Sequence, residues 1–156
     1  MKLPNGRADH LSRPEGAARL LGMSRVHSRT PGWLIAAVLA HLVISVVHGA
    51  AHANAHVPLS PAASLFVYVV ILAGPLIGLA LLWPFRTIGA WVVACTMTAS
   101  LVFGVLNHFV FASLDHVSHV DPRWQPLFAT TAVLLALTEG LGSGLAIRLV
   151  RLETLS

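Results

Sequence analysis

Charged residues are scarce in this chain of 156 residues, since Asp, Glu, Lys and Arg together make up only 10% of it. A soluble domain usually has about 25% charged residues, so this sequence cannot coat a water-exposed surface. The shortage excludes a soluble enzyme, a disordered protein and a nucleic-acid-binding module. The single cysteine, Cys95, excludes an intrachain disulfide and a zinc site built from cysteines. The motifs GxxxxGK, GxGxxG, HExxH and CxxCH are also absent.

Hydrophobic residues make up 56% of the chain and gather in four long stretches. The stretches cover residues 33–51, 62–83, 88–112 and 126–149. None contains Lys or Asp, and the one arginine among them is Arg148, next to the end of the fourth stretch. A helix needs about 20 apolar residues to cross the hydrocarbon core of a bilayer, and helices satisfy every backbone group in lipid. The sequence therefore predicts an all-α integral membrane four-helix bundle.

Arginines near the ends of these stretches lie almost entirely on one side of the predicted bundle. That side has six of them: Arg19, Arg25, Arg29, Arg86, Arg148 and Arg151. The other side has only Arg123. Basic loops stay in the cytoplasm, which predicts a plasma (inner) membrane protein with both termini cytoplasmic. The net charge of +4 then reflects topology and attraction to anionic lipid, and indicates no nucleic-acid partner. A homo-oligomer or a larger membrane complex is compatible with this pattern.

Residues 1–30 are polar and are predicted to form a disordered basic cytoplasmic arm, with Met23 as an alternative start. Residues 31–151 are predicted to form one four-span domain, and residues 152–156 a cytoplasmic tail. The small residues around Ala51 and Ala53 also resemble a signal-peptide cleavage site. Three more apolar stretches follow, which favours an uncleaved first helix.

Histidine is the residue type in excess, because nine histidines outnumber the six acidic residues. His41, His48, His52 and His56 are spaced by 7, 4 and 4 residues, which places them within about 80° on one helix face. We expect the first helix to be able to continue beyond the outer membrane surface as far as His56. The pair His48 and His52 has the i, i+4 spacing with which one helix can hold a metal ion.

A second group of histidines follows the third apolar stretch. If that helix continues, His108, Asp115 and His119 share one face and His116 lies close to it. The candidate metal ligands are therefore His48, His52, His108, His116, His119 and Asp115. The secondary candidates near them are His56, Asn107 and Tyr68. All of them lie on the predicted outer side, whereas the cytoplasmic flanks have only His10 and His27.

These ligands suit copper, zinc or iron. Haem b is an alternative cofactor if His48 or His52 faces His108 across the bundle. A third interpretation is that these histidines are solvated helix ends with no specific chemistry. The sequence identifies neither a catalytic residue nor a substrate.

A deeper polar pair is predicted in the hydrocarbon region. His41 and Glu139 lie at similar distances from the cytoplasmic side, and buried polar groups in a bundle usually face inward and pair. This pair favours either a hydrogen-bonded clasp between two helices or a proton relay in a small transporter or channel. A non-catalytic membrane subunit is the remaining alternative. The spacing of Gly74 and Gly78, and of Gly140 and Gly144, indicates close helix packing.

Overall fold

The computed structural model describes the backbone of residues 14–155 and the side chains of residues 30–155. Every regular element in this part of the chain is a helix. The elements in order are α1 (Pro14–Asn54), α2 (Pro61–Phe66), η1 (Val67–Ala73), α3 (Gly74–Leu81), α4 (Arg86–Val105), η2 (Leu106–Val110) and α5 (Gln125–Thr154). They form four helical segments that are long and apolar enough to cross a membrane. The all-helical prediction with four such segments is thereby confirmed.

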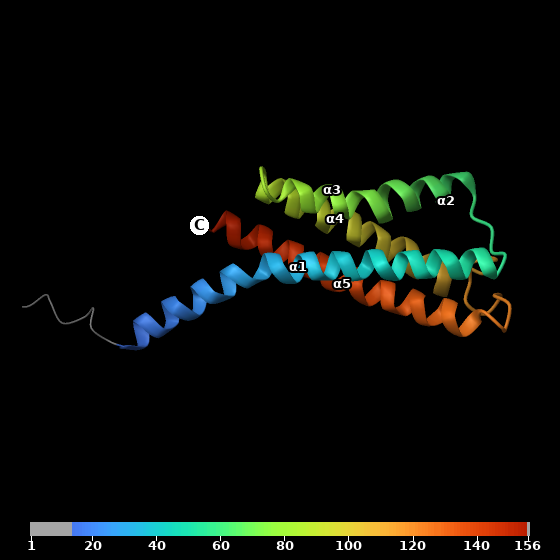
Figure 1. Ribbon diagram of the computed structural model, residues 1–156, viewed down its shortest axis with the longest axis horizontal. Coiled ribbons are helices and arrows are strands. Elements are labelled where there is room, and N and C mark those ends of the chain that lie inside the picture. Colours follow the sequence, from blue (N-terminus) through green and yellow to red (C-terminus); the bar gives the residue numbers. More distant parts are fainter. Residues whose placement is uncertain (1–13, 156) are drawn as a thin grey trace, which may run out of the picture.

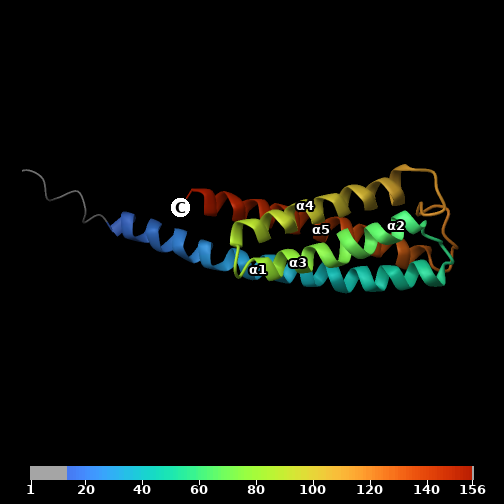
Figure 2. The same ribbon diagram turned by 90° about the horizontal axis from the view of Figure 1, so that it is seen from above.

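The four segments lie in two layers (Figures 1 and 2). One layer contains α1 beside the continuous rod of α2, η1 and α3, and the other contains α4 and α5. The chief helix contacts are those of α4 with α5, α1 with α5, and α3 with α4. The side between α1 and the α2–η1–α3 rod is therefore the most loosely closed side of the bundle.

Helix α1 begins at Pro14, so part of the arm predicted for residues 1–30 belongs to a helix. Residues 17–29 include Ala, Leu, Met and Arg, which are good helix formers, and this outweighs their polarity. Residues 1–13 lie outside the described residues, as does the side chain of His27. Helix α1 changes direction where it joins the bundle (Figure 1), near Pro31, which lies inside the helix and removes one backbone hydrogen bond.

The α2–η1–α3 rod begins with a well-defined cap and widens in its middle. The Ser60 hydroxyl accepts a hydrogen bond from the Ala63 amide at 3.1 Å, and Pro61 occupies the first turn. The seven residues of η1 form a π-helix that ends at Ala73, two residues before Pro75. Proline has no N–H to donate to the carbonyl four residues earlier, which is that of Ile71. The widened turn accommodates this missing bond.

Glycines bring α3 and α4 into close contact. A side-chain carbon on Gly89 would lie 2.6 Å from the Leu82 amide nitrogen and 2.7 Å from the Gly78 carbonyl oxygen. Neither backbone atom can move aside, so only glycine fits at position 89. Gly74 and Gly78 therefore lie at the contact between α3 and α4, whereas Gly140 and Gly144 face open space.

The third segment ends earlier than the sequence indicates. Helix α4 passes into a π-helical turn, η2, which ends at Val110, and Phe111 is extended. Residues 111–124 then form a loop without regular structure. The condition under which His108, Asp115 and His119 would share a helix face is therefore not met, because the loop folds back and Val117 donates its amide proton to the His108 carbonyl. The fourth segment, by contrast, extends further than predicted, because α5 includes residues 152–154.

The buried core has different chemistry at its two ends. At the end near Arg86 the buried side chains are apolar and include Leu34, Val93, Met97 and Leu149. At the opposite end a small apolar cluster of Ala51, Val120 and Phe128 lies beside buried histidines. The buried histidines His48, His52 and His108 are thus gathered at one end of the bundle.

Candidate metal centre

Helix α1 provides two imidazoles on its buried face. His48 and His52 are 6% and 9% exposed, and they continue the inward stripe that includes Leu34, Val38 and His41. One helical turn separates them, so their rings are neighbours on one helix face, arranged edge to face with centroids 4.9 Å apart. The periodicity of apolar residues and histidines along α1 therefore points both rings into the bundle.

A Schellman turn ends α1 directly after His52. The Val57 amide donates to the His52 carbonyl at 3.1 Å, and the His56 amide donates to the Ala53 carbonyl at 3.3 Å. His56 has a φ of 53°, the left-handed conformation that this turn requires. The prediction that the helix continues as far as His56 is therefore wrong, and His56 is exposed to solvent. The turn satisfies the last carbonyls of α1 and fixes the end of the helix that carries His52.

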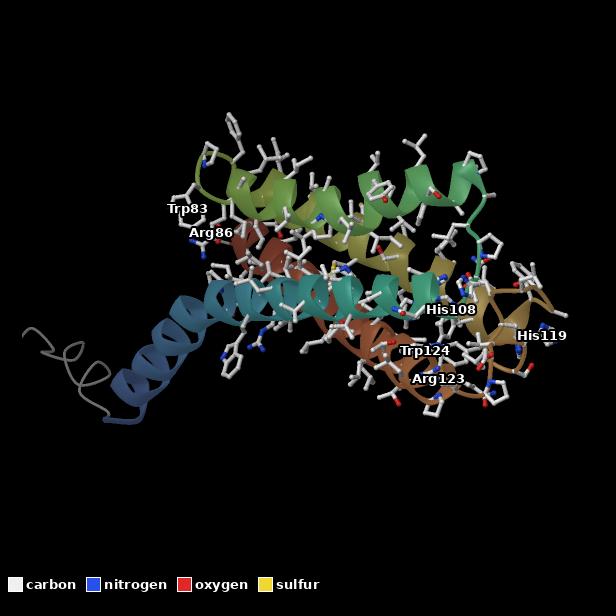
Figure 3. The ribbon with its side chains drawn as sticks, turned by 45° about the vertical axis from the view of Figure 1, so that its right-hand side comes forward. Trp83, Arg86, His108, His119, Arg123 and Trp124 are labelled. Atoms are coloured by element: carbon white, nitrogen blue, oxygen red, sulfur yellow. The ribbon has the colours of Figure 1, made fainter. Side chains whose placement is uncertain are left out.

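The π-helical turn η2 provides the third imidazole. His108 is 7% exposed, and its Nε2 atom lies 3.2 Å from Nε2 of His48. Figure 3 shows His108 among the helix ends, directed toward the end of α1. One ring nitrogen each from His48, His52 and His108 lies within 4.8 Å of the other two. Within the side chains that the structure describes, no other group of three His, Cys or acidic residues has this arrangement.

Helix α5 provides a phenyl ring that packs against all three imidazoles, and one hydrogen-bond acceptor. Phe128 is fully buried, and its ring centroid lies 4.7 Å from those of His48 and His52 and 5.2 Å from that of His108. The Thr131 hydroxyl oxygen lies 2.8 Å from Nδ1 of His48. This packing restrains the rotamers of all three imidazoles.

The hydrogen bonds of two rings determine which nitrogen carries the proton. Nδ1 of His108 lies 3.0 Å from the Asp115 carbonyl oxygen, which can only accept, so this nitrogen donates. The Thr131 hydroxyl donates to the Leu127 carbonyl at 2.7 Å, so its oxygen accepts from Nδ1 of His48. In a neutral imidazole the other nitrogen then has a free lone pair. Both Nε2 lone pairs consequently face each other across 3.2 Å.

Such a contact between two acceptors is repulsive unless a cation lies between them. A shared proton would relieve it, and so would a metal ion bound by both nitrogens. Two nitrogens held at about 2.0–2.1 Å from a tetrahedral ion are separated by about 3.3 Å, close to the 3.2 Å observed. Nδ1 of His52 is also buried and has no hydrogen-bond partner among the described residues. One ring nitrogen of His52 lies within 4.8 Å of nitrogens of the other two rings, and three converging nitrogens favour a metal ion over a proton, which only two nitrogens can share.

Asp115 places a negative charge against two of the rings. Its Oδ1 atom lies 3.2 Å from Nε2 of His52 and 3.4 Å from Nδ1 of His108. Burial raises the pKa of this carboxyl, but the contact with His108 and the nearby imidazoles outweigh burial and hold the pKa below its usual value of 3.8. An ionised Asp115 therefore orients both rings and balances part of the charge of a bound cation.

The remaining candidates lie outside this centre. His119 is exposed at the outer edge of the loop (Figure 3), where its Nδ1 donates to the Ser113 carbonyl. His116 is half-buried, and its Nδ1 accepts from the Ser118 amide. Asn107 donates its side-chain amide to the Phe103 carbonyl at 2.8 Å, and Tyr68 is 67% exposed. The interrupted third helix explains why His116 and His119 do not face the three imidazoles.

A haem held between His48 and His108 does not fit this geometry. Axial nitrogens on opposite faces of an iron ion, each at about 2 Å, would be about 4 Å apart. The two Nε2 atoms are 3.2 Å apart, which leaves no room for a porphyrin plane between them. A single ion bound on one side by both rings fits the same distance.

The buried pair of His41 and Glu139 lies deeper in the bundle. Both residues are at most 3% exposed, and Nδ1 of His41 lies 3.7 Å from Oε1 of Glu139. Nε2 of His41 donates to the Ile71 carbonyl at 3.1 Å. This is the carbonyl that Pro75 leaves without its usual helical partner. His41 therefore satisfies a backbone defect in the neighbouring segment while its other nitrogen faces Glu139.

Sequence reasoning missed Thr131, Phe128 and the Asp115 carbonyl as parts of the centre. Thr131 and Phe128 are three residues apart on the buried face of α5. Their spacing predicts that both are buried, but it does not predict that they contact the imidazoles. Comparisons with protein families, characterised proteins and solved structures find no match to this chain.

Proposed function

We propose that the chain is a four-span membrane protein that binds one transition-metal ion at the end of the bundle facing away from the cytoplasm. Four apolar segments support the membrane assignment. Many large apolar side chains on their outer faces are exposed, including Val43, Ile77 and Leu137, as expected for contact with lipid. The bilayer is therefore the main partner.

The distribution of charge supports the orientation of the proposed membrane protein. Arg86 lies with Trp83 at one end of the bundle, and His108, Arg123 and Trp124 lie at the other (Figure 3). Arg148 and Arg151 near the end of α5 belong to the Arg86 end. Arginine-rich ends stay in the cytoplasm and tryptophans gather at both interfaces. Both termini are accordingly cytoplasmic, and the three imidazoles face the outer side of the plasma membrane.

One observation carries the metal proposal: the Nε2 atoms of His48 and His108 face each other at 3.2 Å. The proton of each ring is on the other nitrogen, Nδ1, where it is donated to a hydrogen-bond acceptor. Three imidazoles leave at least one position on a tetrahedral ion for water or another ligand. This donor set fits zinc, copper or iron. A site with an open position serves metal handling or chemistry at the metal, whereas a purely structural site is closed by its protein ligands.

Metal analysis of the purified full-length protein tests this function. We expect about one equivalent of bound metal in the wild type after addition of zinc or copper, and its loss in His48→Ala and His108→Ala. His119→Ala is the matched control, because this exposed histidine from the same loop is expected to leave the metal content unchanged. Equal metal content in all four proteins would contradict the proposed centre.

Cysteine labelling on intact cells tests the membrane orientation separately. Cys95 is the only native cysteine, so Cys95→Ser gives a clean background for Ser118→Cys in the loop and Leu155→Cys near the end of α5. An impermeant maleimide should label position 118 and not position 155. The reverse pattern would invert the orientation, and equal labelling of both positions would contradict a membrane topology with both termini inside.

A further inference from the structure

A cavity of about 290 Å³ lies in the middle of the bundle, directly beneath the candidate metal centre. His48, His52 and His108 line one end, and Glu139 lines the other. The positions of His48 and Ser45 on α1, and of Ala132 and Glu139 on α5, show that the cavity runs along the helix axes. It extends for about 10 Å, the length of seven helical residues.

The wall between the two ends is apolar. It is formed mainly by the side chains of Val46, Val67, Leu72, Phe103, Leu135 and Ala136. Tyr68 and the three serines Ser45, Ser64 and Ser100 also line it. The Ser45 hydroxyl donates to the His41 carbonyl at 2.8 Å. The Ser100 hydroxyl donates to the Thr96 carbonyl at 2.9 Å. The histidine and acidic side chains that line the cavity are the three imidazoles and Glu139.

The cavity lies on the side where the bundle is most loosely closed. Val46 of α1 and Tyr68 of η1 both line it, and they are 65% and 67% exposed. These helices run beside each other in one layer (Figure 2), but α1 makes its main contacts with α5. In a membrane this side faces acyl chains, so a molecule dissolved in the bilayer reaches the cavity without crossing a polar surface.

We propose that this cavity binds a single-chain, lipid-soluble molecule with one oxygen-containing head group, such as a hydroxyl or a carboxylate. The head group occupies the open position on the metal, and the chain lies along the apolar wall toward Glu139. This inference rests on the metal centre proposed above. Ligand pockets are mostly apolar with a few convergent polar groups and have volumes of about 300–1,000 Å³. A volume of about 290 Å³ accommodates one short chain and excludes a two-chain phospholipid.

Two hydroxamates that differ only in chain length test this inference on the full-length protein loaded with cobalt. Acetohydroxamate probes the metal alone, and octanohydroxamate probes the metal together with the cavity. Both are expected to shift the visible absorption spectrum of the bound cobalt. Ala136→Phe fills the cavity and is expected to weaken the binding of octanohydroxamate by about tenfold or more, because the methylenes of its chain lose their apolar contacts. Acetohydroxamate binding is expected to be unchanged.

Ala40→Phe is the matched control, because Ala40 is exposed on the outer face of α1 and does not line the cavity. Val67→Phe places a ring in the cavity from the opposite wall, so the test does not depend on the folding of one variant. Unchanged octanohydroxamate binding in a filled variant that retains cobalt would overturn the cavity proposal. A wild type that binds no cobalt, measured before any probe is added, would overturn the metal centre itself.

Discussion

The substitution Thr131→Val is expected to weaken metal binding although Thr131 is not a ligand. Valine has nearly the same shape as threonine but no oxygen. The Thr131 oxygen accepts the proton of His48 Nδ1 at 2.8 Å, and this bond leaves the lone pair on Nε2, opposite His108. Without the acceptor, the proton can move to Nε2, where it competes directly with the metal ion.

The size of the effect follows from the burial of this hydrogen bond. Both Thr131 and His48 are at most 6% exposed, so water cannot replace the lost acceptor. An unpaired buried donor costs about 1–3 kcal/mol, which corresponds to a decrease in affinity of about 5- to 150-fold. Changes to residues that orient a metal-binding histidine typically have a similar size, about 10- to 100-fold.

A competitive zinc titration with a coloured chelator measures this effect on the purified protein in detergent. Thr130→Val is the matched control, because Thr130 is the next residue along α5 and is exposed. Thr131→Ser restores the hydroxyl and is expected to recover most of the affinity. Thermal unfolding of the metal-free variants shows whether the substitution also destabilises the fold.

The outcome that refutes this reasoning is specific. If Thr131→Val binds zinc as tightly as the wild type and Thr130→Val does too, the Thr131 hydroxyl does not orient His48. If Thr131→Val and Thr131→Ser are equally weak, a change in packing and not the hydrogen bond is responsible.

Four further predictions concern other parts of the molecule. Asp115→Asn should weaken zinc binding by about 10- to 100-fold, because the wild-type carboxyl, with its lowered pKa, is ionised at neutral pH. A zinc affinity equal to that of the wild type would show that the charge of Asp115 does not contribute to binding. Zinc affinity should fall as the pH is lowered from about 7 to about 5, because protons compete for the imidazole lone pairs; a flat titration would exclude histidine ligands. Glu139→Gln should fold normally, since an uncharged amide of the same size fits this buried position and can donate toward Nδ1 of His41, and loss of folded protein on size-exclusion chromatography would contradict this. Gly89→Ala should destabilise the protein by about 1–3 kcal/mol, whereas Gly144→Ala, with open space around it, should not; equal unfolding temperatures would contradict the close packing of α3 and α4.

The four apolar segments could be predicted from the sequence because hydrophobic length is a local property of the chain. The inward stripe of His41, His48 and His52 could also be predicted, since periodicity along one helix fixes their common face. What could not be predicted was how the third segment ends. Composition does not reveal a π-helical turn at residues 106–110, and this turn removes His116 and His119 from the face of His108.

The partners of the buried polar groups could not be predicted from the sequence for a different reason. The acceptor for His48 is a hydroxyl 83 residues away in the sequence, on α5. The acceptor for His41 is the backbone carbonyl of Ile71, and backbone atoms carry no sequence signature. Contacts of this kind depend on how helices pack, whereas the sequence specifies mainly which face of each helix is buried.

The division of the centre among three segments has a consequence for the order of assembly. His48 and His52 come from α1, and His108 comes from the end of the α4 segment. Thr131 and Phe128 come from α5, which follows the other three segments along the chain. A nascent chain that has inserted only the earlier helices lacks the Thr131 hydroxyl and the Phe128 ring, which orient the imidazoles. If the proposed centre binds metal, high-affinity binding therefore requires α5 to be in place, and a chain without this helix is not expected to take up the ion.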